Sequence, residues 1–404
     1  MAAMKAAKMT TKFSMEPMLP EEANRELDDL ALELAERANS FAARANPVLQ
    51  QSIGNLVRSM NCYYSNLIEG HDTLPIDIDR ALADDYAQDT DKRNLQLEAR
   101  AHIEVQAMID HGEATYPTLS VEFILWLHEA FCSRLPPELL QSKDPATDEI
   151  IPVVPGQLRD RMVQVGRHIP PEPDVLPDLL DRFIEAYDPK RLSKLRQIIG
   201  VAAAHHRLAW IHPFLDGNGR VTRLMSHAWL RDLGIGTELW SVSRGLARTV
   251  NDYKARLQVA DQPRRGDRDG RGNLTEAGLT EFCLYFLTTC VDQLNYMEDL
   301  LEPEELLNRI DVWCEEEIRQ KRLPKGSWPL LREAVLTGEF ERGRAEEITG
   351  YKERQARTVL NVLIDEGCLV SPTSRSKVRL GFPLKVVERW LPLLYPSGAI
   401  SGKA

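Results

Sequence analysis

The chain has 404 residues, a length that predicts two to three domains at roughly 150 residues each. Hydrophobic residues make up 43% and charged residues 27%, which excludes a disordered or fibrous protein. The 61 acidic residues outnumber the 50 basic ones, and this net charge of −11 argues against non-specific nucleic-acid binding by the whole chain. The longest apolar run, Ile198 to Ala204, is far shorter than the roughly 20 residues of a transmembrane helix.

Few features of the sequence indicate a targeting segment, a disulfide or a metal site. No continuous apolar segment follows the basic residues within 1–15, so a signal peptide is not expected. The six cysteines are scattered without a Cys-x-x-Cys pair, which indicates free thiols and no structural zinc site. These features together predict a cytoplasmic protein that does not associate with a membrane.

Helix signals dominate the chain as far as residue 300. Apolar side chains recur at helical spacing over residues 21–45, and Pro47 opens a second helix that ends at Gly70. The stretch from Gly156 to Gly166 alternates loosely between proline-rich segments, which predicts a short β-hairpin. A charged loop is expected over residues 262–273, and further helices over residues 76–87, 92–112, 118–134, 175–187, 192–211, 219–233, 244–261 and 275–300.

The last hundred residues have a different pattern. A helical stretch is followed by a short helix, a turn at Gly350, a second helix and two short strands, an order that predicts a winged helix-turn-helix. These elements are expected over residues 303–340, 345–349, 352–366, 368–371 and 377–380.

The predicted winged helix has a modest basic bias. Residues 342–382 carry eight basic and five acidic residues, a net charge of +3. DNA binding would place the helix over residues 352–366 in the major groove, with Lys352, Arg354 and Arg357 on or beside its leading turns. The other interpretation, a module that docks a protein or forms a homodimer, stays open from the sequence.

One segment, residues 211–223, concentrates polar chemistry and reads IHPFLDGNGRVTR. Two glycines flank Asn218 at the start of a predicted helix, where free backbone amides offer a site for phosphate groups. Arg220 and Arg223 share a face of that helix, so both guanidinium groups can reach the same phosphates. The spacing predicts an anion-binding cradle.

Two further side chains in this segment add reactivity. Asp216 provides a hard oxygen ligand that suits Mg²⁺ bridging a polyphosphate. His212 is a residue type that accepts a proton from a hydroxyl at neutral pH. The segment holds no Ser or Cys nucleophile, which favours direct transfer to an acceptor hydroxyl over a covalent enzyme intermediate.

The pattern His-Pro-Phe-x-Asp-Gly-Asn-Gly-Arg-x-x-Arg resembles the signature of the Fic (filamentation induced by cyclic AMP) domain family at every defined position. The resemblance implies a mostly α-helical bundle that transfers AMP from Mg·ATP to a Ser, Thr or Tyr hydroxyl of a protein, including the chain itself. It further implies that His212 is the general base and that Asp216 binds the metal. The residues implied to bind ATP are Gly217, Asn218, Gly219, Arg220, Arg223 and Tyr253.

A second motif, Ser65-Asn66-Leu67-Ile68-Glu69-Gly70, lies far upstream. By itself it is a helix end, with Ser65 and Glu69 one turn apart and Gly70 as the stop. Beside a Fic core it resembles the inhibitory motif of one large class of the family. That resemblance implies that Glu69 pairs with Arg223 and occupies the place of the γ-phosphate, which would disfavour productive ATP binding.

The resemblance also assigns a role to the predicted hairpin. It implies a flap that aligns a target segment by strand addition, with Arg159, Val163 and Val165 as positioning residues. The expected domain organisation is a flexible tail (1–20), an N-terminal helical region (21–115) that contains the inhibitory helix (47–70), a Fic core (116–300) and a C-terminal winged-helix domain (301–404).

The sequence therefore predicts an ATP- and Mg²⁺-dependent protein adenylyltransferase that is auto-inhibited by Glu69. Two alternatives remain. The same site could remove AMP from a modified protein, since Glu69 could position a water molecule. The chain could also be a DNA-binding regulator whose Fic site senses a nucleotide without turnover, although the intact His212 argues against an inactive site.

Overall fold

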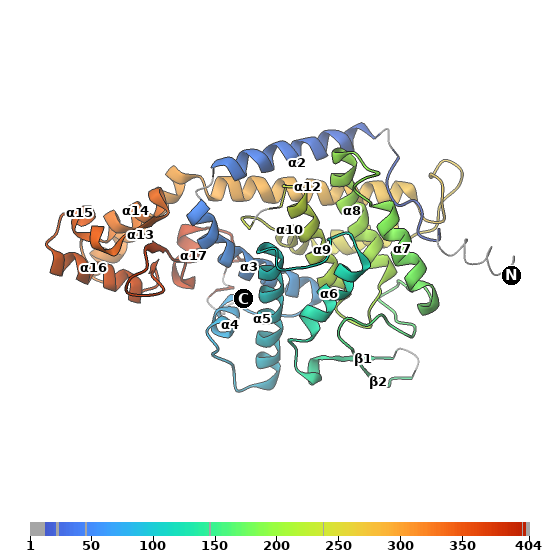
Figure 1. Ribbon diagram of the computed structural model, residues 1–404, viewed down its shortest axis with the longest axis horizontal. Helices are drawn as coiled ribbons and strands as arrows, with labels where there is room; N and C mark the ends of the chain where they lie inside the picture. The colour runs from blue at the N-terminus through green and yellow to red at the C-terminus, as the bar shows by residue number, and fades with distance from the viewer. Residues whose placement is uncertain are drawn as a thin grey trace.

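The computed structural model describes residues 13–400 except residues 22–23, 45–46, 145–146, 237 and 398. Helices dominate this part of the chain, as the sequence predicts (Figure 1). No helix within the described ranges is long and apolar enough to cross a bilayer. All six cysteines are buried and free, which confirms the expectation of free thiols.

The predicted helices before residue 300 are present, with ends that move by a few residues. The predicted helix over 244–261 is two helices, because the chain leaves helical geometry at Thr249, whose hydroxyl donates to the carbonyl of Gly245. The elements are α2 (Arg25–Arg44), α3 (Pro47–Glu69), α4 (Pro75–Leu82), α5 (Thr90–Asp110), α6 (Val121–Cys132), α7 (Leu176–Ala186), α8 (Lys194–Ile211), α9 (Asn218–Asp232), α10 (Val242–Arg248), α11 (Val250–Ala260) and α12 (Glu276–Leu300).

The helices pack around α8 and α9. Helix α2 lies along α12, and α12 also contacts α8, so the amphipathic face that carries Leu27 and Leu34 is fully buried (Figure 1). Helix α3 contacts α5, α9 and α10. The ends of α8, α9 and α3 therefore come together, which places the two sequence motifs in one region of the molecule.

The β-hairpin lies upstream of its predicted position. Strand β1 (Gln141–Lys143) pairs antiparallel with β2 (Ile150–Pro152), with Ser142 opposite Ile151. The prediction of a hairpin over residues 156–166 is wrong, since that segment forms only a single bridge between Val165 and His168. The physical reason is that the loop folds around the buried Arg159, whose guanidinium takes up backbone carbonyls that a hairpin would use.

Residues 13–20 belong to the core. Met15 and Met18 are buried, and the carbonyl of Glu16 accepts hydrogen bonds from the amides of Asn273 and Leu274. The expected flexible tail over residues 1–20 is therefore wrong for residues 13–20, because apolar side chains and backbone pairing fix them. Residues 1–12 lie outside the described residues.

The C-terminal part contains the helices, turn and strands that the sequence predicts there, in the predicted order. Strands β3, β5 and β4 form an antiparallel sheet in that spatial order. The assignment as a winged helix stays a prediction. The elements are α13 (Pro303–Arg319), α14 (Ser327–Thr337), β3 (Glu339–Phe340), α15 (Ala345–Thr349), α16 (Glu353–Asp365), β4 (Leu369–Val370), β5 (Val378–Leu380) and α17 (Leu384–Trp390).

The C-terminal part packs directly on α3. The Arg379 guanidinium on β5 donates to the Gln51 side chain at 2.6 Å, near the start of α3. Towards the other end of the helix, the Tyr64 hydroxyl donates to the carbonyl of Leu394 at 3.1 Å, and the rings of Tyr63 and Tyr395 meet edge to face. Helix α3 is therefore held by the core and by the C-terminal part.

The buried carboxylate of Asp110 joins the three helices α3, α5 and α9. Asp110, at the end of α5, accepts from Arg58 of α3 at 2.8 Å and contacts the His227 ring of α9 at 2.7 Å. Burial opposes ionisation of Asp110, but His227 and Arg58 outweigh it and lower the pKa of that carboxyl. Asp110 therefore fixes α3 relative to α9.

We predict that Asp110→Ala lowers the free energy of unfolding by about 3–5 kcal/mol, because it removes the closer counter-charge of the buried Arg58 and leaves only the contact with Glu238 at 3.6 Å. Denaturant titration of the full chain measures this. The control is Asp85→Ala, which breaks the exposed pair with Arg80 and should leave the free energy of unfolding close to that of wild type. Equal losses in the two variants would contradict the role of Asp110.

Candidate functional site

The turn between α8 and α9 carries the first motif in a strained backbone. His212 ends α8 in the left-handed conformation, with φ at 50°, and its amide donates to the carbonyl of Leu208. This region is uncommon for a residue other than glycine, and it is kept only where the surroundings enforce it. The enforcing contacts come from Arg159, whose guanidinium donates to the His212 carbonyl at 2.8 Å and whose amide donates to the Pro213 carbonyl at 2.9 Å.

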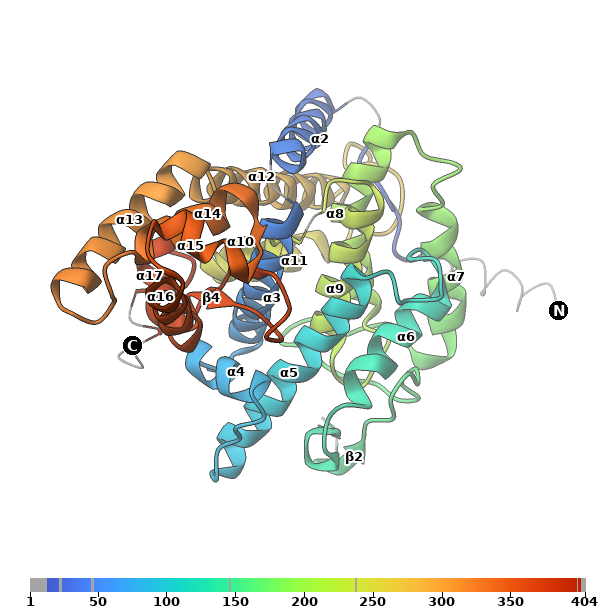
Figure 2. The same ribbon diagram turned by 60° about the vertical axis from the view of Figure 1, so that its left-hand side comes forward.

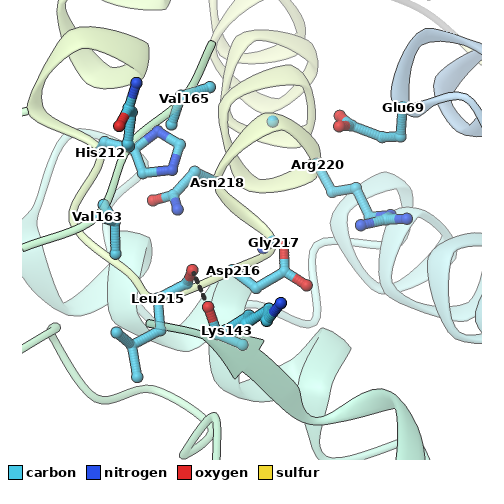
Figure 3. Close-up of a pocket in the computed structure, with 13 residues that line it drawn as sticks. Glu69, Lys143, Val163, Val165, His212, Leu215, Asp216, Gly217, Asn218 and Arg220 are labelled. Carbon is cyan, nitrogen blue, oxygen red and sulfur yellow. Dashed lines mark hydrogen bonds between the residues drawn. The ribbon is translucent and has the colours of Figure 1, made fainter. Parts of the chain in front are cut away.

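This turn opens onto a cavity of about 240 Å³ (Figure 3). His212 and Asp216 line it from the turn, and Glu69 approaches from α3 on the far side of α9 (Figure 3). The remaining lining residues come from β1, the loop before His168 and the start of α9: Ser142, Lys143, Val163, Gln164, Val165, Leu215, Gly217, Asn218, Gly219 and Arg220.

The N-terminus of α9 points its first amides into this cavity region. Gly217 adopts φ of 77°, which turns the chain into the helix, and no side chain caps the helix at this end. The Asn218 side chain is used inside the turn, where it accepts from the Phe214 amide and donates to the Phe214 carbonyl. The helix end therefore offers an anion site made of backbone, and Asn218 shapes it.

Asp216 stands at the exposed rim of the cavity. One carboxylate oxygen accepts from the Gly217 amide at 2.7 Å. Crowding by protein atoms raises the pKa of Asp216, and the nearby Glu69 carboxylate adds to that effect. The described residues contain no cluster of three or more His, Cys, Asp or Glu that could hold a metal by themselves. A metal bound at Asp216 would therefore need oxygen ligands from a substrate or water.

The His212 imidazole is neutral in this environment. Burial lowers its pKa to about 3, and the neighbouring His168 and Arg159 add to the effect. A neutral ring nitrogen can accept a proton, and it faces the cavity beside Val163 and Val165 (Figure 3). The position suits a proton acceptor for a group that enters the cavity.

Arg223 meets the second motif, which lies 154 residues away in the sequence. Its guanidinium donates to the Glu69 carboxylate at 2.5 Å and to the Ser65 hydroxyl at 2.9 Å. Gly219 permits this approach, since a Cβ there would lie 2.2 Å from a Glu69 oxygen. The contact that the sequence predicts between Glu69 and Arg223 is therefore present.

The ion pair between Glu69 and Arg223 persists when the pH changes near neutrality. Burial opposes ionisation of Glu69, but Arg223 and Arg220 outweigh it and lower its pKa to about 2. A carboxylate with a depressed pKa keeps its contribution above its ordinary pKa and loses it only as the pH falls through the lowered value. Near-neutral pH changes therefore leave this pair intact.

Arg220 is held by residues that sequence reasoning missed. Its guanidinium bonds to the buried Glu98 carboxylate of α5, contacts the His71 ring at 3.1 Å and lies over the Phe131 ring. Burial lowers the pKa of His71, and the charge of Arg220 lowers it further. Neither Glu98 nor His71 stands in a recognisable motif, so no pattern in the sequence points to this pairing.

A second cavity, of about 530 Å³, adjoins the first and shares Glu69 and His212 with it. Tyr253 lines it but is almost fully buried, and its hydroxyl meets His205 at 2.8 Å. Apolar and long side chains supply much of the remaining wall: Ile68, Trp210, Lys254 and Leu257. This volume suits a small planar ligand beside the anion site.

The predicted flap residues separate into two groups. Val163 and Val165 line the first cavity beside His212, and their role in a flap stays a prediction (Figure 3). Arg159 is only 3% exposed and holds the His212 turn from behind. The prediction that Arg159 positions a target is therefore corrected: it positions the turn, because all three of its guanidinium nitrogens donate to backbone carbonyls.

Another residue missed from the sequence, His128 of α6, supports the same turn. Its ring stacks on Phe214 with 3.9 Å between the ring centroids. Its Nε2 donates to the Asp216 carbonyl at 3.2 Å, and its Nδ1 accepts from the Gly156 amide at 2.9 Å. A lone histidine on an apolar helix gives no sequence signal for such a role. Its contribution depends entirely on which loops the fold brings to α6.

Comparisons with known proteins agree with this geometry. Residues 118–230 match the model of the Fic/DOC family. The proteins named protein adenylyltransferase Fic in Drosophila erecta and Drosophila willistoni are each 30% identical to this chain over 141 residues, 34% of this chain and 28% of theirs. The match thus spans less than a third of the length of those relatives.

The fold likeness extends over most of the chain. The crystal structure of a Fic family protein from Desulfovibrio desulfuricans G20 aligns with 90% of this chain and 98% of its own length. The TM-score is 0.51 at 17% sequence identity, which indicates a shared fold. Residues 118–230 therefore match the Fic/DOC family model, and the likeness over the rest of the chain shows a shared fold.

Proposed function

We propose that this protein is an adenylyltransferase that transfers AMP from Mg·ATP to a hydroxyl group of a protein, itself included. The observation that carries the proposal is the convergence of His212, Asp216 and the uncapped α9 N-terminus on one cavity. The name of the Drosophila relatives, protein adenylyltransferase, supports this reaction type. We assign AMP transfer to the Fic core (116–300) and inhibition to the helix over residues 47–70 of the N-terminal helical region (21–115).

The chemistry follows from the positions of these groups. An acceptor hydroxyl beside His212 gives its proton to the neutral imidazole as its oxygen attacks the α-phosphorus, and pyrophosphate leaves. The α9 amides and the arginines stabilise the negative charge that develops on the phosphate oxygens. The charge of a bound polyphosphate would also raise the pKa of His212 from about 3 towards the working pH.

The residues present fit a magnesium ion bound with the nucleotide. Mg²⁺ is held by one or two carboxylates together with substrate phosphates and water, and Asp216 is the exposed carboxylate at the cavity rim. When bound there, the ion neutralises phosphate charge and orients the triphosphate. The adjoining cavity beside Tyr253 is the place for the base, and its apolar wall suits a planar ring.

Glu69 limits this reaction in the proposed mechanism. Its carboxylate lies on the guanidinium that a γ-phosphate would use, and its negative charge faces the same position. The low pKa of Glu69 means that protonation does not release Arg223 at physiological pH. Release therefore requires α3 to move or the Glu69 side chain to turn away.

The first test is transfer of label from α-labelled ATP to protein by wild type and His212→Ala. We expect the variant to lose transfer by roughly 10²–10⁴-fold while it keeps ATP affinity, because His212 acts on the acceptor proton. Equilibrium binding of ATP is measured in parallel. A variant that keeps more than about a tenth of wild-type transfer contradicts the proposed base.

A second prediction concerns the metal. Asp216→Ala should lose most of the Mg²⁺ dependence of transfer, since Asp216 is the carboxylate that reaches the cavity rim within this turn. Titration of Mg²⁺ against initial rate measures this. The matched control is Asp85→Ala, which breaks the exposed pair with Arg80 outside the cavity lining and whose titration curve should overlay that of wild type. An unchanged curve for Asp216→Ala would place the metal elsewhere.

The third prediction concerns inhibition. Glu69→Gly and Glu69→Gln should each raise auto-modification about ten- to a hundredfold, because one charge-assisted contact of about 1.5–3 kcal/mol no longer occupies Arg223. The Gln variant keeps the helix end and isolates the effect of charge. Arg223→Ala should not activate, and the double variant should stay as inactive as Arg223→Ala alone.

Two outcomes would count against this scheme. Unchanged transfer in both Glu69 variants would remove the inhibitory role. Wild-type protein that removes AMP from a pre-modified protein, and loses this activity in Glu69→Gln, would instead support the alternative in which Glu69 positions water. The same labelled substrate serves both measurements.

A further inference from the structure

The exposed face of α16 is polar and basic. The opposite face packs on the C-terminal core through Ala356, Val359, Leu360 and Leu363. The solvent-exposed face carries hydrogen-bond donors and acceptors along two to three turns. Within the described part of the chain, no large hydrophobic side chain is exposed on this face. The exposed residues of that face are Glu353, Arg354, Gln355, Arg357, Thr358 and Asn361.

Basic side chains at and beside the start of this face lack an acidic partner among the described residues. Among the residues that the structure describes, Lys325, Lys352, Arg354 and Arg357 form no ion pair within 4.0 Å, whereas neighbouring basic residues do. The paired ones are Arg344 with Glu333 and Glu347, Lys377 and Arg379 with Glu339, and Lys385 with Glu366. Side chains that lack an internal partner here keep their charge available to a ligand.

A groove runs beside these cations. It has a volume of about 510 Å³ and lies between the segment before α14 and the leading turns of α16. Lys325 and Lys352 stand on its walls with Arg354, Gln355 and Thr358. Glu353 is the acidic exception at this end of the helix, and Asp365 lies at the far end. The local charge is therefore positive in a chain whose net charge is −11.

The position of α16 leaves this face accessible. Helices α15 and α16 form one end of the long axis of the molecule, away from the Fic domain helices α6 to α9 (Figure 1). Turning the molecule brings α16 to the front without another helix over it (Figure 2). The tip between β4 and β5 carries the exposed Arg375 in the same part of the chain.

The chemistry of this face fits duplex DNA better than a protein. Protein interfaces have aromatic or aliphatic centres depleted of charge, and this face has neither. Arginine reads guanine, and glutamine or asparagine reads adenine, at base edges in the major groove, which admits one α-helix. Lysines beside the helix match the phosphate backbone.

We propose that α16 enters the major groove of duplex DNA, with Arg354, Gln355 and Arg357 at base edges and Lys325 and Lys352 on phosphates. The acidic remainder of the chain is repelled by the phosphates, which confines binding to this end of the molecule. This function is separate from AMP transfer, and its test does not depend on the Fic site.

The experiment uses the full-length protein and a pool of DNA duplexes with a random centre. Repeated selection at 100 mM salt should enrich a sequence, and fluorescence anisotropy then measures its affinity at several salt concentrations. The double variant Arg354→Ala with Arg357→Ala should bind the enriched duplex roughly a hundredfold more weakly and lower the salt slope by about one to two.

A matched control separates this face from general charge. Arg268→Ala with Arg271→Ala makes the same charge change in the exposed 262–273 loop, at the opposite end of the molecule in Figure 1, and should bind as wild type does. A duplex RNA of the enriched sequence should bind more weakly, since its major groove is too narrow for a helix.

Three results would overturn the proposal. The pool could fail to enrich, the α16 double variant could bind within threefold of wild type, or the RNA duplex could bind as tightly as the DNA. Thermal denaturation of both double variants checks that they fold as wild type does. Their auto-modification activity should also match wild type, because none of the four arginines lies at the Fic site.

Discussion

Two buried arginines three residues apart on α9 constrain the rest of this structure. Each guanidinium is removed from water, so each needs a counter-charge or the helix could not be buried as it is. Arg223 obtains its partner from α3 through Glu69, and Arg220 obtains its partner from α5 through Glu98. The need to neutralise this pair therefore places α3 and α5 on either side of the proposed phosphate site.

The start of α9 depends on the conformation of the preceding turn, which other side chains hold in place. His212 stays in the left-handed region because Arg159 bonds to the carbonyl of His212 and, through its own amide, to that of Pro213. His128 stacks on Phe214 and supports the loop below. A base, a carboxylate and an uncapped helix end then face one cavity.

Helix α3 links the two halves of the molecule. Its last turn carries Glu69, while its length contacts the α16-bearing C-terminal part through Gln51, Tyr63 and Tyr64. Asp110 fixes α3 to α9 through buried charges at the back of the site. The helix that occupies Arg223 is therefore also one on which the C-terminal part packs, so the two regions share one structural element.

The sequence by itself determined the features that depend on neighbours along the chain. Residues 212–223 form one turn and one helix start, so their spacing was enough to predict a common site, and helical periodicity located α2, α3, α9 and α12 closely. Glu69 was found only because its own segment carries a motif. Each of these signals lies within one short segment, and the helical preference of such a segment is retained in the folded protein.

Tertiary structure alone decided the pairings between distant segments. The partner of Arg220, the role of Arg159 and the position of the β-hairpin depend on which loops meet around α8 and α9. The family resemblance assigned Arg159 to the flap, and only the backbone carbonyls that surround it in the folded structure make its burial favourable. In the sequence, Glu98 is indistinguishable from the other glutamates on predicted helices. It becomes the counter-charge of Arg220 because the fold brings the two side chains together, and such a pairing requires no fixed spacing along the chain.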